Sequence, residues 1–281
     1  MSDGGSEYTV ANWLREASGL THPHGLGLVL MAYVLKKPKT WVLSHSDLLL
    51  SSEQLKQLDE LTNRLLKGEP LAYLTGEQAF SGLSFIVSPA VLIPRPETEI
   101  LVEEALHWLS AHPQAGQVVD VGTGSGCIAV TLAFHRPEVK VLATDISEEA
   151  LTIARQNAER YSVSDRVALT LSDLLPSADA SFDLVCANLP YIPTGKLGEV
   201  NSLPYEPRLA LDGGKDGLDL IRRLLNLLPA KIHHHGLILL EIEALQGQAA
   251  LSLAEDTFPG SKISLKQDLA GLDRLIQIEV N

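Results

Sequence analysis

The chain has 281 residues, of which 45% are hydrophobic and 20% charged, and its formal net charge at pH 7 is -13. This length exceeds the usual size of one compact domain, and the composition is that of a globular protein, so two domains are expected. The acidic balance disfavours a broad phosphate-binding surface, and no apolar run is long enough to span a membrane, so we expect no stable binding to nucleic acid or to a membrane. The first residues lack the features of a signal peptide, which predicts a cytoplasmic protein.

Residues 1–75 have the pattern of a helical domain. Segments 9–19, 24–35 and 52–67 place apolar side chains at helical spacing, and Gly68 follows the third segment. No group of residues suited to catalysis lies in this region. We therefore expect a docking or packing role for it.

The pattern changes over residues 76–93, where Gly82 and Pro89 interrupt a series of apolar residues. This pattern predicts a short β-hairpin that links the helical domain to a second domain. The next stretch, Pro94-Arg95-Pro96-Glu97-Thr98-Glu99, predicts the start of a helix with Pro96 in its first turn. Arg95, held between two prolines, is suited to form part of a pocket wall.

Residues 94–281 alternate between strands and helices. Strands are predicted at 118–121, 140–144, 167–171, 182–187, 236–241, 262–266 and 274–280, and helices at 127–135, 147–161, 218–228 and 246–255. This order predicts an α/β fold with a mostly parallel, doubly wound sheet. The last two strands are expected to form an antiparallel hairpin.

Cysteines and clustered histidines do not indicate a metal site. Cys127 and Cys186 both lie in apolar stretches, so we expect reduced thiols in the core. His233, His234 and His235 precede a predicted strand, and no partner ligands at suitable spacing accompany them. A solvated turn is expected there, and no metal.

Successive strands of the second domain end in polar residues. The first ends in the glycine turn Asp120, Gly122, Thr123, Gly124, Ser125 and Gly126, the second in Asp145 and Ile146, and the third in Asp173 and Leu174. Glycines let backbone N–H groups approach a ligand, and an acidic residue before them suits a cationic amino group. Asp145 is placed to accept ribose hydroxyls, with Ser147 left to cap the next helix, and Asp173 to accept an adenine amino group. Together with Asn188 at the end of the next strand, this order predicts a pocket for S-adenosylmethionine.

The fourth strand ends abruptly at Asn188-Leu189-Pro190-Tyr191. In open α/β sheets ligands bind at the carboxyl ends of strands, so this loop is a candidate site. We expect the Asn188 side-chain oxygen and the Leu189 carbonyl to accept the two N–H bonds of a substrate amide, with Pro190 fixing the loop and Tyr191 packing against the substrate. The alternative is that Asn188 is only a turn residue and Tyr191 belongs to the core.

The chain resembles the release factor glutamine methyltransferase family (PrmC/HemK) over nearly its full length. The matching segments are residues 68–76, 92–99, 120–126, 188–191 and 268–274, of which Ile-Pro-Arg-Pro-Glu-Thr-Glu within 92–99 is the most discriminating. The resemblance implies a class I S-adenosylmethionine-dependent methyltransferase domain at 94–281, behind a hairpin at 76–93 and a substrate-recognition domain at 1–75. Leu189 stands where proline is usual in the family, and Leu174 where relatives can have an aromatic residue.

The resemblance further implies methylation of the glutamine in the Gly-Gly-Gln motif of class I peptide chain release factors, with S-adenosylhomocysteine as product. We expect a monomer that uses no metal. Two alternatives stay open. One is an enzyme that methylates adenine amino groups in nucleic acid, since the same loop can hold a flipped base. The other is a noncatalytic module that binds release factors and retains the fold.

Overall fold

The computed structural model describes residues 8–20, 25–177, 180–199 and 205–281. The chain divides into two compact units, Met1–Gly76 and Glu77–Asn281, which we describe separately. No helix in the described ranges is both long and apolar enough to cross a membrane.

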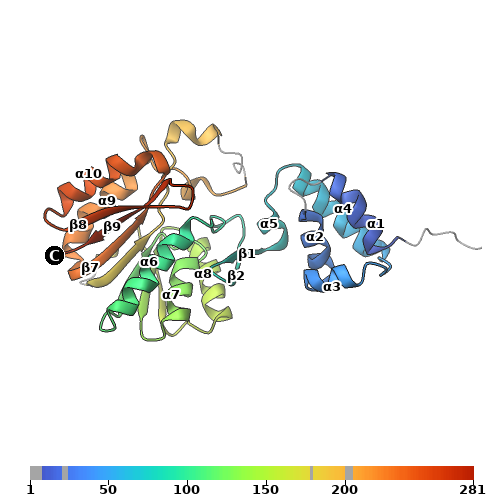
Figure 1. Ribbon diagram of the computed structural model, residues 1–281, viewed down its shortest axis with the longest axis horizontal. Coiled ribbons are helices and arrows are strands. Elements are labelled where there is room, and N and C mark those ends of the chain that lie inside the picture. Colours follow the sequence, from blue (N-terminus) through green and yellow to red (C-terminus); the bar gives the residue numbers. More distant parts are fainter. Residues whose placement is uncertain (1–7, 21–24, 178–179, 200–204) are drawn as a thin grey trace, which may run out of the picture. The chain divides into compact units, whose positions relative to one another are not determined.

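Unit 1 is helical (Figure 1). Its helices are α1 (Val10–Leu20), α2 (Leu26–Leu35), α3 (Lys39–Ser44), α4 (Ser52–Leu66) and α5 (Leu71–Thr75). The three predicted helices are confirmed, except that His24 lies outside the described residues. The sequence analysis missed α3 and α5 because a helix of five or six residues is too short for its periodicity to be recognised.

The core of unit 1 forms around α2, whose sequence is almost entirely apolar. Leu30 and Met31 are fully buried among side chains from α1 and α4, including Trp13 and Leu58. The start of α4 is fixed by a capping box in which Ser51 and Gln54 bond each other's backbone N–H groups. Packing and capping therefore account for a small helical domain.

Unit 2 begins with a hairpin and continues with alternating strands and helices. The strands are β1 (Glu77–Phe80), β2 (Leu83–Ile86), β3 (Gln117–Val121), β4 (Lys140–Asp145), β5 (Val167–Leu171), β6 (Phe182–Ala187), β7 (Ile232–Glu241), β8 (Lys262–Gln267) and β9 (Asp273–Glu279). The α-helices are α6 (Thr98–Ala111), α7 (Cys127–His135), α8 (Glu148–Arg160), α9 (Asp219–Leu227) and α10 (Gly247–Thr257), with 3-10 turns η1 (Thr194–Glu199), η2 (Arg208–Ala210), η3 (Leu228–Ala230) and η4 (Ala244–Gln246).

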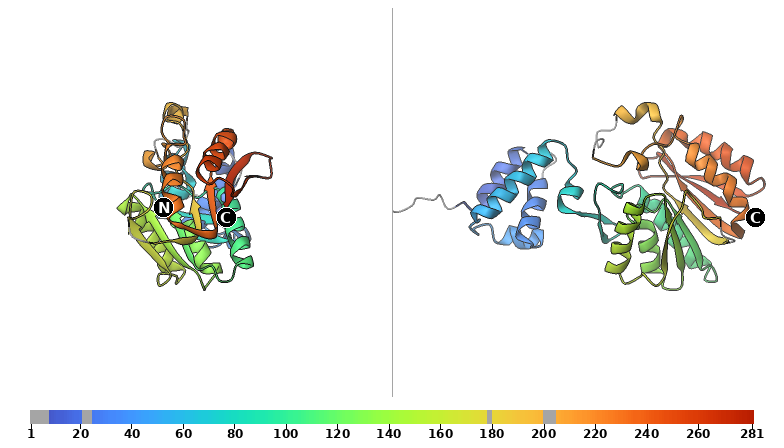
Figure 2. Two further views of the ribbon diagram at one scale, coloured as in Figure 1. Left: turned by 90° about the vertical axis from the view of Figure 1, so that its left-hand side faces the viewer. Right: turned by 180° about the vertical axis from the view of Figure 1, so that it is seen from behind.

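The main sheet has the strand order β5-β4-β3-β6-β7-β9-β8. Strands β3 to β7 run parallel, and β9 pairs antiparallel with both β7 and β8. Helices α6, α7 and α8 cover one face, and α9 and α10 the other (Figures 1 and 2). The predicted mostly parallel sheet with an antiparallel terminal hairpin is confirmed.

Helices cover both faces of this sheet, so both faces are buried. Successive side chains of a strand point to opposite faces, and each strand therefore contributes to two apolar layers. Val118 and Leu184 pack under α6 and α7, whereas Val119 and Val185 pack under α9 and α10. Cys127 and Cys186 are free thiols in the first of these layers, as predicted. Burial raises the pKa of Cys186 above its ordinary value, so it stays protonated.

Two local predictions are wrong. The histidines 233–235 are not in a turn before a strand but inside β7, where the pairing register with β6 is interrupted between Phe182 and Leu184. His235 adopts a φ of 63°, which is the local irregularity that leaves these side chains exposed. Pro96 lies outside α6, because the chain first makes a turn in which Thr98 N–H donates to the Arg95 carbonyl.

Asn157 on α8 joins three segments of unit 2. Its side-chain oxygen accepts a hydrogen bond from Ile86 N at 2.7 Å, and its Nδ2 donates to the carbonyls of Ile86 (2.9 Å) and Ser125 (2.8 Å). The residue is fully buried. The β1–β2 hairpin and the glycine turn after β3 are therefore attached to the same helix by one amide.

We predict that Asn157→Ala lowers the free energy of unfolding by about 2–4 kcal/mol, because it removes the partner of the buried Ser125 carbonyl and of two part-buried backbone groups of Ile86. Urea unfolding followed by circular dichroism measures the change. Asn226→Ala, on an exposed position of α9, is the matched control and should change stability much less. Equal effects of the two substitutions would contradict this role for Asn157.

Candidate functional site

A cavity of about 770 Å³ opens at the carboxyl ends of β3, β4 and β6. The strand order reverses at the neighbours β3 and β6, since the chain passes from β3 to β4 and β5 on one side and then returns to β6 on the other. Open α/β sheets bind ligands at such a switch point, and this volume lies in the range of roughly 300–1,000 Å³ usual for small-molecule sites.

The glycine turn after β3 forms one wall of the cavity, through Gly122, Thr123, Gly124 and Ser125. Asp145 at the end of β4 holds this turn, because its Oδ2 accepts a hydrogen bond from Gly124 N at 2.8 Å. Its other oxygen accepts from Ser147 N at 2.9 Å, while Ser147 itself caps α8 as predicted. The Asp145 carboxylate therefore orders the turn and also lines the cavity.

Asp120 lies behind the turn and does not line the cavity. It is fully buried, and its Oδ2 accepts hydrogen bonds from Thr123 Oγ1 (2.6 Å) and Ala129 N (3.2 Å). Its Oδ1 has no hydrogen-bond partner among the described residues. Burial raises the pKa of Asp120 to about 7. Asp120 therefore bonds to the glycine turn and to α7, and it leaves one buried acceptor without a partner behind the cavity wall.

Leu189 closes the opposite side of the turn. It is 4% exposed, and a methyl group added at Gly122 would lie 3.0 Å from Leu189 Cδ2. Gly122 has a φ of 74°, a conformation that favours glycine as well. The Asn188–Tyr191 loop therefore packs directly on the turn that forms the other wall of the cavity.

Asn188 lines the cavity and has a defined orientation. Its Nδ2 donates a hydrogen bond to Thr98 Oγ1, the first residue of α6, at 2.9 Å. Thr98 is 2% exposed. The Oδ1 atom of Asn188 makes no hydrogen bond within the described part of the chain. The acceptor end of this amide is thus available to a ligand.

Glu241, the last residue of β7, lies behind Thr98 and Tyr191. It is 3% exposed, and its Oε2 has no partner among the described residues. Burial raises the pKa of Glu241 to about 7; the Thr98 hydroxyl opposes this by hydrogen bonding, and the Arg274 charge also opposes it. A carboxyl group that titrates near neutral pH is therefore adjacent to the loop.

Asp173 and Leu174, which follow β5, line the cavity. Ile146, which follows β4, lines it as well. Asp173 is held by Arg223 of α9, whose Nη2 lies 2.7 Å from its Oδ2. Leu174 is buried and adopts a φ of 66°.

Four residues named by the sequence analysis do not line the cavity: Asp120, Gly126, Tyr191 and Arg95. Tyr191 is half-buried, and burial raises the pKa of its hydroxyl above its ordinary value. Arg95 forms an ion pair with Glu206, whose side chain is fully buried and also accepts a hydrogen bond from Ile93 N. Pro94 and Thr98, on either side of Arg95 in the sequence, are the residues of segment 94–99 that line the cavity.

Sequence reasoning missed Thr98 and Glu241, which support Asn188 and the loop after β6. Glu241 lies at the carboxyl end of β7, next to β6. The rule that ligands bind at the carboxyl ends of parallel strands, which predicted Asn188, could therefore have predicted Glu241 as well. Thr98 carried no signal, because its contact to Asn188 spans 90 residues.

Two family models match the chain. One, described as the PrmC N-terminal domain, matches residues 14–76, and one described as the methyltransferase small domain matches residues 97–200. Among solved structures, a ribosomal protein L11 methylase from Lactobacillus delbrueckii subsp. bulgaricus aligns with a TM-score of 0.50 at 24% identity, over 66% of this chain and 81% of that one. A 16S rRNA methyltransferase from Thermus thermophilus, solved with AdoMet and guanosine, aligns with a TM-score of 0.54 at 18% identity, over 73% and 50%. The fold is that of a class I methyltransferase.

Curated relatives define the family more closely. The release factor glutamine methyltransferase of Moorella thermoacetica is 40% identical over 260 residues, which cover 92% of either chain. The enzyme of that name from Geobacter sulfurreducens is 41% identical over 81% of this chain and 79% of its own. The chain belongs to the release factor glutamine methyltransferase family and is a methyltransferase.

The raised pKa of Glu241 predicts a pH-dependent stability. Between its ordinary value of 4.5 and about 7, the folded state binds more protons than the unfolded state, so the stability that Glu241 contributes is lost as pH rises through this window. Glu241→Gln does not titrate. We therefore expect the variant to gain about 2 kcal/mol relative to the wild type on going from about pH 5 to about pH 8.

Chemical denaturation of both proteins at the two pH values measures this difference. Glu255→Gln on an exposed position of α10 is the matched control. A difference between Glu241→Gln and wild type that is the same at both pH values would show that Glu241 is ionised in the folded protein throughout.

Proposed function

We propose that this protein transfers a methyl group from S-adenosylmethionine to the side-chain amide nitrogen of the glutamine in the Gly-Gly-Gln motif of class I peptide chain release factors. S-adenosylhomocysteine is the product, and no metal takes part. The enzyme acts as a monomer in the cytoplasm, where its substrates work.

The orientation of Asn188 is the observation that carries this proposal. Thr98 accepts the Asn188 N–H, so the amide turns its oxygen, not its nitrogen, to the ligand side. An exposed acceptor recognises a group that donates N–H bonds. A primary amide of glutamine is such a group, and the names of the curated relatives indicate the same residue.

The cavity fits the cofactor by the chemistry of its donors and acceptors. Asp145 and Asp173 supply acceptors at two strand ends, and the turn at Gly122–Gly126 lets backbone approach closely. Asp120 lies behind this turn and does not line the cavity, so in this proposal it supports the turn through its bonds to Thr123 and Ala129. When bound, the cofactor supplies a methyl group activated by a sulfonium centre.

The protein contributes orientation. A glutamine amide nitrogen is a poor nucleophile, since its lone pair is delocalised into the carbonyl. Asn188 Oδ1 and the Leu189 carbonyl accept its two N–H bonds and aim the nitrogen at the methyl carbon. Each hydrogen bond contributes about 0.5–1.5 kcal/mol net, whereas correct positioning accounts for as much as roughly 7–11 kcal/mol of a barrier. In this proposal, correct positioning of the amide nitrogen therefore contributes more to the rate than the free energy of the two hydrogen bonds.

Unit 1 provides recognition of the release factor in this proposal. It matches the family model for residues 14–76, and the described part of it contains no His, Cys, Asp or Glu group arranged to hold a metal. The match to this family model is the ground on which we assign its helices to docking of the protein substrate.

Asn188→Ala should lower kcat for methyl transfer by about 100-fold or more, because it removes an acceptor that positions the nucleophile. Cofactor affinity should change little, since the backbone of the turn and Asp145 are untouched. Transfer of labelled methyl to a purified release factor, with calorimetric cofactor binding, measures both. Undiminished transfer would exclude the proposed role.

Thr98 is predicted to act only through its hydroxyl. Thr98→Val keeps the volume but removes the acceptor for Asn188 Nδ2, and should lower kcat by about tenfold. Thr98→Ser retains the oxygen and should keep most of the activity in the same transfer assay. Similar losses in both variants would indicate that packing, not the hydrogen bond, matters at this position.

A further inference from the structure

Residues Asp212–Asp219, which lead from η2 into the first residue of α9, pack against the end of the Asn188–Tyr191 loop and the backbone that follows it. Ile192 N donates to the Leu211 carbonyl at 3.0 Å, and Gly213 N donates back to the Ile192 carbonyl at 2.8 Å. Thr194 N donates to the Gly214 carbonyl at 2.8 Å. We call residues 212–219 the bracing segment.

Glycines allow this close approach. A methyl group at Gly213 would lie 2.6 Å from the Pro190 carbonyl oxygen and 2.7 Å from Tyr191 Cα, distances that real side chains do not adopt. One at Gly217 would overlap the Tyr191 carbonyl oxygen and Gln246 Nε2. A side chain at either of these two glycines would therefore push the backbone of the bracing segment away from the loop.

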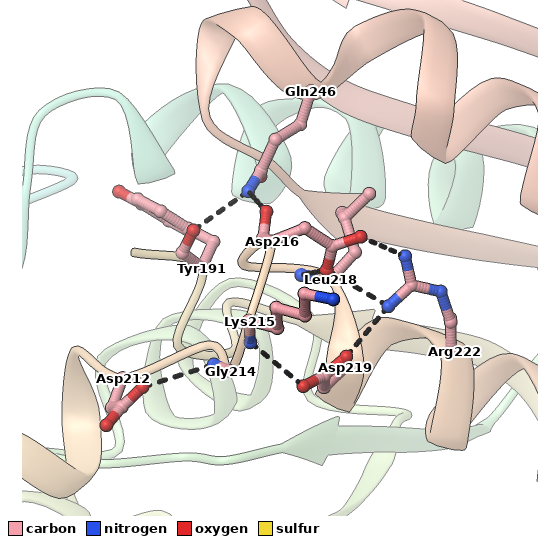
Figure 3. Close-up of polar contacts among 9 residues, drawn as sticks. All are labelled: Tyr191, Asp212, Gly214, Lys215, Asp216, Leu218, Asp219, Arg222 and Gln246. Atoms are coloured by element: carbon pink, nitrogen blue, oxygen red, sulfur yellow. Dashed lines mark hydrogen bonds and ion pairs between the residues drawn. The ribbon is translucent and has the colours of Figure 1, made fainter. Parts of the chain in front are cut away.

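Gln246 joins the two backbones (Figure 3). Its Nε2 donates to the Tyr191 carbonyl at 2.8 Å and to the Asp216 carbonyl at 3.2 Å. Its Oε1 accepts from Glu243 N at 3.1 Å, which fixes the orientation of the amide. The side chain is buried, and both of its N–H bonds are directed to carbonyls of separate segments.

Side chains within the bracing segment and α9 hold it in shape. Asp219 Oδ2 accepts from Lys215 N at 3.1 Å, and Asp216 Oδ1 accepts from Leu218 N at 3.1 Å (Figure 3). Arg222 of α9 forms ion pairs with both of these aspartates. Its hydrogen bond lowers the pKa of Asp216 to about 2. The segment is thus a preformed support for the loop.

We propose that Gln246 is a positioning residue for methyl transfer, which fixes the Tyr191 end of the Asn188–Tyr191 loop by joining the Tyr191 carbonyl to the bracing segment. The inference rests on the proposed function, in which this loop holds the substrate amide. Leu189 has no ring to restrict its φ, so contacts from outside the loop must supply the rigidity. Gln246 does not line the cavity, and its effect reaches the substrate through the loop.

Gln246→Glu tests the hydrogen bond without changing shape. When the introduced carboxyl group is ionised, one of its oxygens can still accept from Glu243 N, but the other faces the Tyr191 and Asp216 carbonyls and cannot donate to them. When it is protonated, it can again donate one hydrogen bond. We expect kcat at about pH 8.5 to fall about tenfold or more below wild type and to recover relative to wild type toward about pH 6, with the KM for cofactor unchanged. Gln246→Met, which has no donor, should stay low across the range.

Gln248→Glu adds the same charge at an exposed position of α10 and is the matched control. Recovery of Gln246→Glu at low pH, absent from Gln248→Glu, supports the inference. Wild-type activity of Gln246→Glu at all pH values overturns it, and so does an equal, pH-independent loss in Gln246→Glu and Gln246→Met.

Hydrogen exchange separates this inference from the proposed function. The amide hydrogens of Ile192 and Thr194 donate to the carbonyls of Leu211, directly before the bracing segment, and of Gly214 within it. In Gln246→Met both should exchange at least several-fold faster than in wild type. Unchanged exchange of both amide hydrogens in Gln246→Met overturns the inference, whichever substrate the enzyme methylates. Absence of methyl transfer by the wild type to a Gly-Gly-Gln protein overturns the proposed function alone, since the exchange result does not depend on it.

Discussion

In the mechanism that we propose, the chemistry of this site depends on the hydrogen bond from Asn188 Nδ2 to Thr98 Oγ1. A side-chain amide has a donor end and an acceptor end of nearly the same shape, and a half-turn exchanges them. Because a buried threonine at the start of α6 accepts the donor end, the acceptor end faces the ligand side. Glu241 lies behind Thr98 and completes the support from β7.

The loop from Asn188 to Tyr191 is shaped by its surroundings more than by its own sequence. Thr98 holds one end, Gln246 holds the other, and Leu189 packs on Gly122 in between. These supports come from α6, the 3-10 turn η4 and the glycine turn, which lie far apart in the sequence. This arrangement explains how the loop keeps a defined form although residue 189 is a leucine, which has no ring to restrict its φ.

The sequence predicted the sheet and its helices because their patterns are local. Segments such as 127–135 and 182–187 carry enough apolar residues to show their type and bounds. Residues at strand ends, including Asn188 and Asp145, were found because topology places them on one edge. Arg95 was assigned to the pocket, but the structure pairs it with Glu206, 111 residues away. Thr98 and Gln246 act through contacts of that kind, which no periodicity reveals.

The identity of the methylated atom is the central claim of this account. A purified release factor is incubated with the protein and S-adenosylmethionine, and the methylated position is then located by tandem mass spectrometry, with a substrate whose motif glutamine is replaced as control. The account predicts a single added methyl group on the side-chain nitrogen of the Gly-Gly-Gln glutamine, absent from the control. A methyl group on another residue, or on adenine of added nucleic acid with none on the release factor, would contradict it.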